Sequence, residues 1–564
     1  MLAYLSFTDN MIYYFQKEMQ AMTEKKADKI LFNGRLITME DEALAQAIAI
    51  KGDRIVYVGT TDEAMKLAHD QTQLIDLGGR VAAPGFVESH THSAGSGANL
   101  FLVLDMRQVY SLEEMLSLIR EKAKNTPKGQ WILCQGYDET KFREADAVLT
   151  AEVLDRATTE HPVYAQRTCG HIAVVNSMAA RLSGFSDDSA DPPGGGHFYK
   201  DEKGHFNGMI SESIMWGMVA KPAFTVAQIK GGVLEGVQPL YFRHGITATS
   251  DMGTKIPIAH MLKQANEEGA LKLKIGIYLN GKRTSLTPTN LERIEKAKVH
   301  LGQSHKNLHF LGAKFYTDGS TGGRTAAFSQ PYADNPENFG QIFIEQEHLN
   351  RDVLAYALAG VQVSIHAIGD RAIEAALQSM EYAQSQGADV KSLRFRIEHL
   401  ESPTLEQIER MNKLNICAGL SSAFIYGLGD SHLEALGYDR LVDAFPAKTL
   451  MENEITVACN CDFPICNVNP MLGIYSMVVR KTEKGQSFGG KKEAIDRMAA
   501  LKAYTKNAAY LLWKEQEIGS LKAGKLADIV VFEDDFLCVA DDALKDVRVY
   551  MTIANGETVY QLEQ

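Results

Sequence analysis

Two histidines separated by a single residue, His90 and His92 in PGFVESHTH, are the most specific chemical signal in the chain. Residues two apart in a strand point to the same side, so both imidazoles can reach one ion. Histidine nitrogens are common ligands of zinc and related divalent metals. The pair predicts part of a metal site at a strand end, the alternative being a chance pair on an exposed strand.

Later apolar runs end in groups of the same chemical kind. Lys314 lies within LHFLGAKFYTDG, and His366, His399 and Asp462 close VQVSIHAIGD, LRFRIEHL and ITVACNCDFP. A single histidine in an apolar strand is usually a satisfied core residue, so each of these residues alone carries little weight. Together with the first pair they predict a ring of ligands around one rim.

Lys314 is the unusual member of this ring, because it places an amine inside an apolar strand, where an unpaired charge is costly. An ammonium group cannot bind a metal ion. Either the lysine pairs with an acid as a structural ion pair, or its pKa is depressed and it reacts with carbon dioxide to give a carbamate. The two oxygens of a carbamate can bridge two ions.

The elements that must position these groups form a regular series. The eight apolar runs are VAAPGFVESHTH, GITATSDMG, LKIGIYLN, LHFLGAKFYTDG, VQVSIHAIGD, LRFRIEHL, NICAGLSS and ITVACNCDFP. Segments such as 347–359 and 371–386 between them are long enough for one helix each. This alternation predicts an α/β fold, a (β/α)8 TIM barrel with the chemical groups at the carboxyl ends of its strands.

Three parts of the chain do not follow this alternation of strands and helices. Residues 27–82 and 515–564 alternate short strands with Asn-Gly and Gly-Gly turns, which predicts a small β-sandwich domain built from both chain ends. Residues 83–514 are the barrel, with a large insertion after strand 1, at about 95–240, that should cover the catalytic face. Residues 1–26 are an N-terminal extension that lacks the basic start of a signal peptide.

Composition limits the partners. The 564 residues carry 58 basic and 71 acidic side chains, a net charge of −13 with both signs scattered along the chain. Nucleic acid and membranes are therefore not expected as partners. Seven cysteines without framework spacing indicate reduced thiols and a cytoplasmic location. Cys459, Cys461 and Cys466 lie close together, but small buried strand residues are a better interpretation than a thiolate metal site.

Several motifs follow one another in the order found in a known family. They are PGFVESHTH, AKFYTDGSTGGRTAAF, VSIHAIGDRA, RIEHLE, CDFP, YTKNAA and GSLKAGKLADIVVF. The chain from about residue 30 to 560 thereby resembles the amidohydrolase superfamily. More narrowly it resembles amidohydrolase family 3, the YtcJ-like branch that includes N-substituted formamide deformylase.

The resemblance implies a metal-dependent hydrolase that attacks an amide or formamide-like C–N bond with metal-bound hydroxide. The implied ligands are His90, His92, Lys314, His366, His399 and Asp462. The first two histidines would hold one ion, the last two a second, and carboxylated Lys314 would bridge them. Zinc or another divalent metal is implied, and Asp462 would also take the proton of the hydroxide.

Two further residues match the family outside the metal ligands. His171, in RTCGHIAVVNS, corresponds to a histidine that faces the substrate, so it is expected to stabilise the carbonyl oxygen or its developing negative charge. Arg324, in GGRTAAF, either binds an anionic group of the substrate or fixes its own loop.

Other positions depart from the family pattern or lie beside a ligand. Glu88 stands where relatives often have aspartate, and Cys461 replaces a small residue next to Asp462. Alternation along a strand predicts that Glu398 faces the opposite side from His399 and is a structural acid.

Two other functions remain open from the sequence. One is a deaminase-like, single-metal hydrolase that uses His90, His92, His366 and Asp462 with an unmodified Lys314. The other is a non-catalytic member that regulates or binds a ligand. The expected partner is a small-molecule amide substrate whose identity the sequence does not reveal, and homodimers are common in the superfamily.

Overall fold

The computed structural model describes residues 26–41, 44–144, 148–192, 195–282 and 306–563. The expected N-terminal extension therefore lies almost entirely outside the described residues. The chain divides into two compact units. The smaller comprises residues 1–87, 242–247 and 513–564, and the larger comprises 88–241 and 248–512.

An eight-stranded sheet forms the centre of the larger unit, in the order β20-β19-β18-β17-β16-β15-β14-β7. Its strands are β7 (Phe86–Thr91), β14 (Ile246–Thr254), β15 (Lys274–Lys282), β16 (Leu308–Tyr316), β17 (Gln362–Ala367), β18 (Arg396–His399), β19 (Cys417–Leu420) and β20 (Val457–Cys459). The pairs from β14 to β20 are parallel. A parallel bridge between Thr91 and Phe463 joins the first strand to the segment after the last. The predicted barrel and its eight strands are thereby confirmed.

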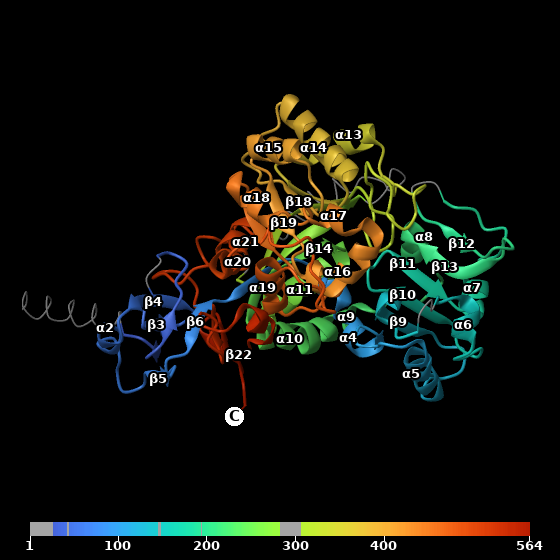
Figure 1. Cartoon of the computed structure of the whole chain (residues 1–564). Helices are drawn as coiled ribbons and strands as arrows, with labels where there is room; N and C mark the ends of the chain where they lie inside the picture. The colour runs from blue at the N-terminus through green and yellow to red at the C-terminus, as the bar shows by residue number, and fades with distance from the viewer. Residues whose placement is uncertain (1–25, 42–43, 145–147, 193–194, 283–305, 564) are drawn as a thin grey trace, which may run out of the picture. The chain divides into compact units, whose positions relative to one another are not determined.

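Helices follow the strands because the intervening segments have one apolar face. The predicted helices at 347–359 and 371–386 are α13 (Gln346–Leu358) and α14 (Asp370–Ser385), which lie side by side with α15 (Leu405–Lys413) in Figure 1. Thr404 begins α15 with a capping box that it forms with Gln407. The remaining helices of this part are α11 (Ile256–Glu267), α16 (Ala423–Leu436), α17 (Tyr438–Leu441), α18 (Ala447–Glu452), α19 (Pro470–Val479), α20 (Arg497–Ala503) and α21 (Lys506–Leu511).

The insertion after β7 contains its own six-stranded sheet, in the order β12-β13-β11-β10-β9-β8. Its strands are β8 (Leu104–Asp105), β9 (Ile132–Tyr137), β10 (Val163–Arg167), β11 (Ile172–Val175), β12 (Phe198–Lys200) and β13 (Phe206–Ser211). The accompanying helices are α3 (Ser93–Ser96), α4 (Asn99–Leu102), α5 (Leu112–Lys124), α6 (Ala151–Asp155), α7 (Ser177–Ser183), α8 (Glu212–Gly217), α9 (Val226–Gly231) and α10 (Gln238–Arg243). Figure 1 shows α5, α6 and α7 beside this sheet. The large insertion expected from the sequence is a folded layer rather than a loop.

The smaller unit contains two sheets. One has the order β4-β3-β1-β5 and the other β2-β6-β21-β22-β23, so the second combines strands from both chain ends. The strands are β1 (Lys29–Phe32), β2 (Arg35–Leu36), β3 (Ala47–Lys51), β4 (Arg54–Gly59), β5 (Gln73–Asp76), β6 (Val81–Pro84), β21 (Ile529–Phe532), β22 (Val549–Ala554) and β23 (Glu557–Gln561), with the helix α2 (Thr61–Met65). A buried cluster that includes Leu31, Ile48 and Ile529 fills the core between them. The sandwich part of the predicted fold is thereby confirmed.

One predicted strand is divided in the structure. The run VAAPGFVESHTH forms β6 in the smaller unit and β7 in the barrel, with Gly85 between them. A Cβ atom on Gly85 would lie 2.4 Å from the hydroxyl of Thr247, so only glycine fits this approach. Periodicity alone does not reveal such a break, because both halves are apolar.

Among the helices in the described part of the chain, none is both long and apolar enough to cross a membrane.

Candidate metal centre

The six residues expected as metal ligands line one cavity of about 190 Å³ in the larger unit. His90 and His92 come from the end of β7, Lys314 from β16, His366 from β17 and His399 from β18. Asp462 follows β20. The cavity is lined by these residues and by Ser96, Asn99, Gln135, Gln166, Cys169, Gly170, His171, Trp216, Tyr316, Pro464 and Ile465. Half of its wall therefore belongs to the insertion.

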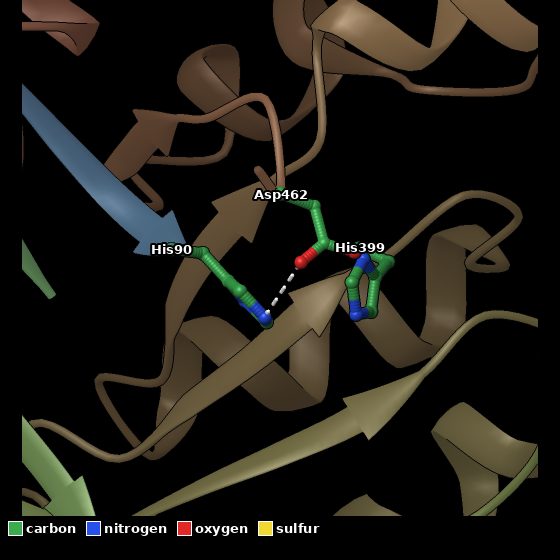
Figure 2. A group of neighbouring side chains, drawn as sticks. All are labelled: His90, His399 and Asp462. Atoms are coloured by element: carbon green, nitrogen blue, oxygen red, sulfur yellow. Dashed lines mark ion pairs between the residues drawn. The ribbon is translucent and has the colours of Figure 1, made fainter. Parts of the chain in front are cut away.

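The closest grouping within this cavity is that of His90, His399 and Asp462. One ligand atom from each lies within 4.8 Å of the others. Figure 2 shows the three side chains pointing toward one another from two strand ends and the loop after β20. Asp462 Oδ1 lies 3.4 Å from His90 Nε2 and 3.3 Å from His92 Nε2. It is also a buried oxygen without a hydrogen-bond partner among the described residues.

Neighbouring groups fix which nitrogen of each imidazole faces Asp462. His90 Nδ1 lies 2.8 Å from Glu398 Oε2, and His92 Nδ1 lies 2.7 Å from the carbonyl oxygen of Met252. Both oxygens accept, so each Nδ1 carries the hydrogen and each Nε2 carries a lone pair. Two lone pairs and a carboxylate oxygen thus face one another, an arrangement that a cation between them would stabilise.

Hydrogen bonds also fix the orientation of the other two histidines. The Ser421 hydroxyl donates to Asn460 Oδ1, so it accepts the Nδ1 hydrogen of His399 at 2.8 Å. His366 Nε2 donates to the carbonyl oxygen of Gly319, also at 2.8 Å. The rings of His366 and His399 have centroids 4.4 Å apart. His399 therefore presents Nε2, and His366 presents Nδ1, as lone-pair donors to a metal.

Burial sets the protonation of this cluster. Burial, together with the neighbouring positive charge of Lys314, lowers the pKa of His90, and burial beside His366 lowers the pKa of His399. Burial raises the pKa of Asp462 to about 8, although the nearby Lys314 acts in the opposite direction. Neutral imidazoles are the form that binds metals. A divalent cation would take the place of the proton on Asp462, so the donor set fits such an ion.

Lys314 is fully buried, and its Nζ lies 3.4 Å from His90 Nε2. Its ammonium group also lies 5.3 Å from the centroid of the Tyr316 ring. The lysine thus reaches the same cavity as the histidines.

The expectation that Glu398 faces away from the site is wrong. Its carboxylate is fully buried and contacts His90, Ser364 and Arg396. The physical reason is that His399 has a φ of +70°, which breaks the strand alternation and lets adjacent side chains point inward. Glu88 is buried too, and its Oε2 accepts a hydrogen bond of 3.0 Å from the backbone N–H of Cys461.

His171 lies in the cavity wall on the insertion side. Its Nδ1 lies 2.8 Å from Glu212 Oε2, and its ring centroid lies 5.5 Å from that of His366. Arg324 is placed differently, because its guanidinium pairs with Asp334 and donates to the carbonyl oxygen of Gly322. It does not line the metal-site cavity.

Sequence reasoning did not identify the groups that hold the histidines, namely Glu398, Ser421, the Met252 carbonyl and Glu212. Of these groups, only Glu398 could have been found from the sequence, because it is an acid next to a candidate ligand. The cysteines of the described residues are free, and Cys459, Cys461 and Cys466 are buried as expected, but only Cys459 lies in a strand, because β20 ends there.

An eight-stranded parallel barrel with imidazoles and a carboxylate at its strand ends defines the class of metal-binding barrel hydrolases. Residues 73–560 match the model of the amidohydrolase family, and the chain belongs to that family.

Individual relatives agree along almost the whole chain. It is 29% identical over 547 residues to the putative amidohydrolase YtcJ of Bacillus subtilis, which covers 94% of this chain and 99% of that protein. It is 24% identical over 551 residues to the N-substituted formamide deformylase of Arthrobacter pascens, covering 96% and 99% of the two chains. An uncharacterized metal-dependent hydrolase from Pyrococcus horikoshii OT3 superposes with a TM-score of 0.70 at 26% identity, over 91% of this chain and 99% of that one.

Proposed function

We propose that the protein hydrolyses the C–N bond of a small amide or formamide-like substrate in a metal-dependent reaction. The observation that carries the proposal is the convergence of His90, His399 and Asp462 on one cavity, with the ligating nitrogens turned toward the carboxylate. The likeness to a protein named N-substituted formamide deformylase, along 99% of its length, supports the substrate class.

In this proposal His90, His92 and Asp462 would hold one divalent ion, zinc being expected. His366 and His399 would hold a second, and a carboxylated Lys314 would contribute oxygen ligands to both. Bound there, the ions would lower the pKa of a water molecule toward neutrality and polarise the substrate carbonyl.

Asp462 is proposed to move the proton. A carboxylate beside the attacking water can accept its hydrogen and pass it to the nitrogen that leaves. Burial raises the pKa of this group to about 8 before any cation is bound. A bound cation would lower this pKa, so that the group would be a carboxylate when the water attacks the carbonyl and, having taken its proton, an acid when the nitrogen departs.

His171 is proposed to stabilise the negative charge that develops on the carbonyl oxygen. In its doubly protonated form, with Glu212 as counter-ion at Nδ1, the ring would donate its Nε2 hydrogen to that oxygen. Trp216 packs against the same ring, with centroids 5.4 Å apart, and restricts its orientation.

The test is hydrolysis of a panel of N-formyl and N-acyl amines by zinc-loaded protein. The variant Asp462→Asn should lower kcat by about 10²- to 10⁴-fold, because it removes the group that moves the proton. The matched control is Asp430→Asn, since Asp430 is also buried but accepts a hydrogen bond from Thr482. Equal activity in all three proteins, or activity in none, would contradict the proposal and favour a non-catalytic ligand-binding protein.

A single-ion, deaminase-like reaction is the second candidate. In this candidate Lys314 would remain an amine, and its Nζ lies 3.4 Å from His90 Nε2. Metal analysis and the intact mass of the native protein separate the two mechanisms. Two ions per chain with 44 Da of added mass (CO₂) support the bridged site, whereas one ion without added mass supports the single-ion reaction.

A further inference from the structure

A second, larger cavity of about 620 Å³ adjoins the metal site. The two cavities share five lining residues, which are His92, Asn99, Gln135, Gln166 and Trp216. Its volume falls within the range of about 300–1,000 Å³ that is typical of small-molecule pockets. A substrate held at the metal ligands would therefore extend into this space.

The residues that line this cavity and do not line the metal site are mainly apolar. They include Leu133, Val219, Phe224, Met252 and Ile258. Such a lining favours an apolar segment of the substrate, because burial of apolar surface contributes about 25 cal/mol per Å².

Lys221 contributes a positive charge to this mainly apolar wall. Its ammonium group lies 3.7 Å from the centroid of the Tyr164 ring, and among the described residues no carboxylate forms an ion pair with it. Burial lowers the pKa of Lys221 to about 8, and the charge of Lys255, which lines the same cavity, acts in the same direction. An ammonium in these surroundings is stabilised by a ligand that brings a negative charge.

The one acid in the cavity wall does not supply that charge. Asp251 is buried, and its Oδ1 accepts hydrogen bonds from the Ser93 hydroxyl at 3.1 Å and the Ala94 N–H at 2.7 Å. Its Oδ2 accepts a hydrogen bond from the Thr254 hydroxyl. Both oxygens of Asp251 are thus engaged within the protein, by α3 and by Thr254, and Lys221 and Lys255 determine the sign of the charge offered to a ligand.

We propose that this cavity binds the distal part of the substrate, an apolar segment that ends in a carboxylate, and that Lys221 pairs with that carboxylate. The inference rests on the proposed function for the position of the scissile bond. It narrows the substrate class to monoanionic N-acyl or N-formyl compounds with an apolar spacer. Lys221 is here a specificity-determining residue that lies apart from the metal ligands.

The test compares two probes of the same shape, 4-phenylbutyrate and the uncharged 4-phenylbutanamide, by isothermal titration calorimetry with the metal-loaded full chain. In Lys221→Met the dissociation constant for the carboxylate should rise about 10- to 100-fold, as expected for a charge-assisted contact, while that for the amide stays unchanged. Lys221→Arg should restore most of the affinity. Lys230→Met is the matched control, because Lys230 is also half-buried on the insertion but pairs with Glu268.

Each outcome has one interpretation. Unchanged carboxylate binding in Lys221→Met would overturn the inference, since the probe would then bind elsewhere, for example at the metal ions. Equal weakening of both probes would also overturn it, because Lys221 would then be structural. Loss confined to the carboxylate supports the inference even if no amide of the panel is hydrolysed. These two results together would contradict the proposed hydrolysis but not the binding of a carboxylate by Lys221.

Discussion

Each histidine of the candidate centre is held in one tautomer by a neighbouring hydrogen-bond acceptor. His90 donates to a carboxylate, His92 to a carbonyl oxygen and His399 to a serine hydroxyl. Partners of this sort fix the orientation of a ligand and raise its basicity, and their loss typically costs 10- to 100-fold in metal affinity. The candidate ligands could be predicted from the sequence but these partners could not, because a serine or carbonyl has no distinctive motif.

Two adjacent serines test this orientation. Ser421 and Ser422 are both fully buried, but only Ser421 contacts a candidate ligand, whereas Ser422 lies 2.8 Å from the Tyr504 hydroxyl. Ser421→Ala should weaken zinc binding about 10- to 100-fold, and Ser422→Ala should leave it within about two-fold. Competition with a chromogenic chelator measures both. Equal effects of the two substitutions would mean that the Ser421 hydroxyl has no specific part in orienting His399.

At the scale of elements, all eight barrel strands and the helices at 347–359 and 371–386 could be predicted from the sequence. Buried parallel strands are continuous apolar runs, and amphipathic helices separate them. Two local features of the backbone could not be predicted in this way. The break at Gly85 lies inside a uniformly apolar run, and the φ of +70° at His399 overrides the alternation expected of a strand. Glu398 lies on the same side as Arg396, two residues earlier, and the positive φ brings His399 to that side as well.

The space that Glu398 occupies comes from a glycine on the neighbouring strand. A Cβ atom on Gly419 of β19 would lie 2.1 Å from Glu398 Oε2, so Gly419→Ala should displace the carboxylate from His90. Zinc affinity should fall about 10- to 100-fold, and the melting temperature should fall as well.

Gly217→Ala is the control for this substitution, because Gly217 lies in α8 and its Cβ would meet no atom within 4 Å. It should leave zinc binding unchanged and slightly raise stability, since alanine favours a helix by about 1 kcal/mol over glycine. Calorimetry and zinc titration measure both variants. Normal zinc affinity in Gly419→Ala would show that Glu398 does not orient His90.

At the scale of the molecule, the candidate centre and the adjoining cavity both lie within the larger unit. The barrel supplies the candidate ligands, and the insertion supplies His171, Trp216 and Lys221. That the candidate ligands meet at one rim could be predicted, because the strand ends of a barrel do so. The cavity could not, because its lining comes from separate segments between residues 92 and 258 that share no motif. The residues proposed to select the substrate therefore come from segments that no sequence motif brings together.

The central claim is that residues far apart in the sequence bind a common metal ion. A crystal structure of zinc-loaded protein, with anomalous diffraction recorded on both sides of the zinc edge, tests it most directly. We expect an anomalous peak at about 2.0–2.2 Å from His90 Nε2 and from a carboxylate oxygen of Asp462. A peak elsewhere, or none at this cavity in active protein, would contradict it.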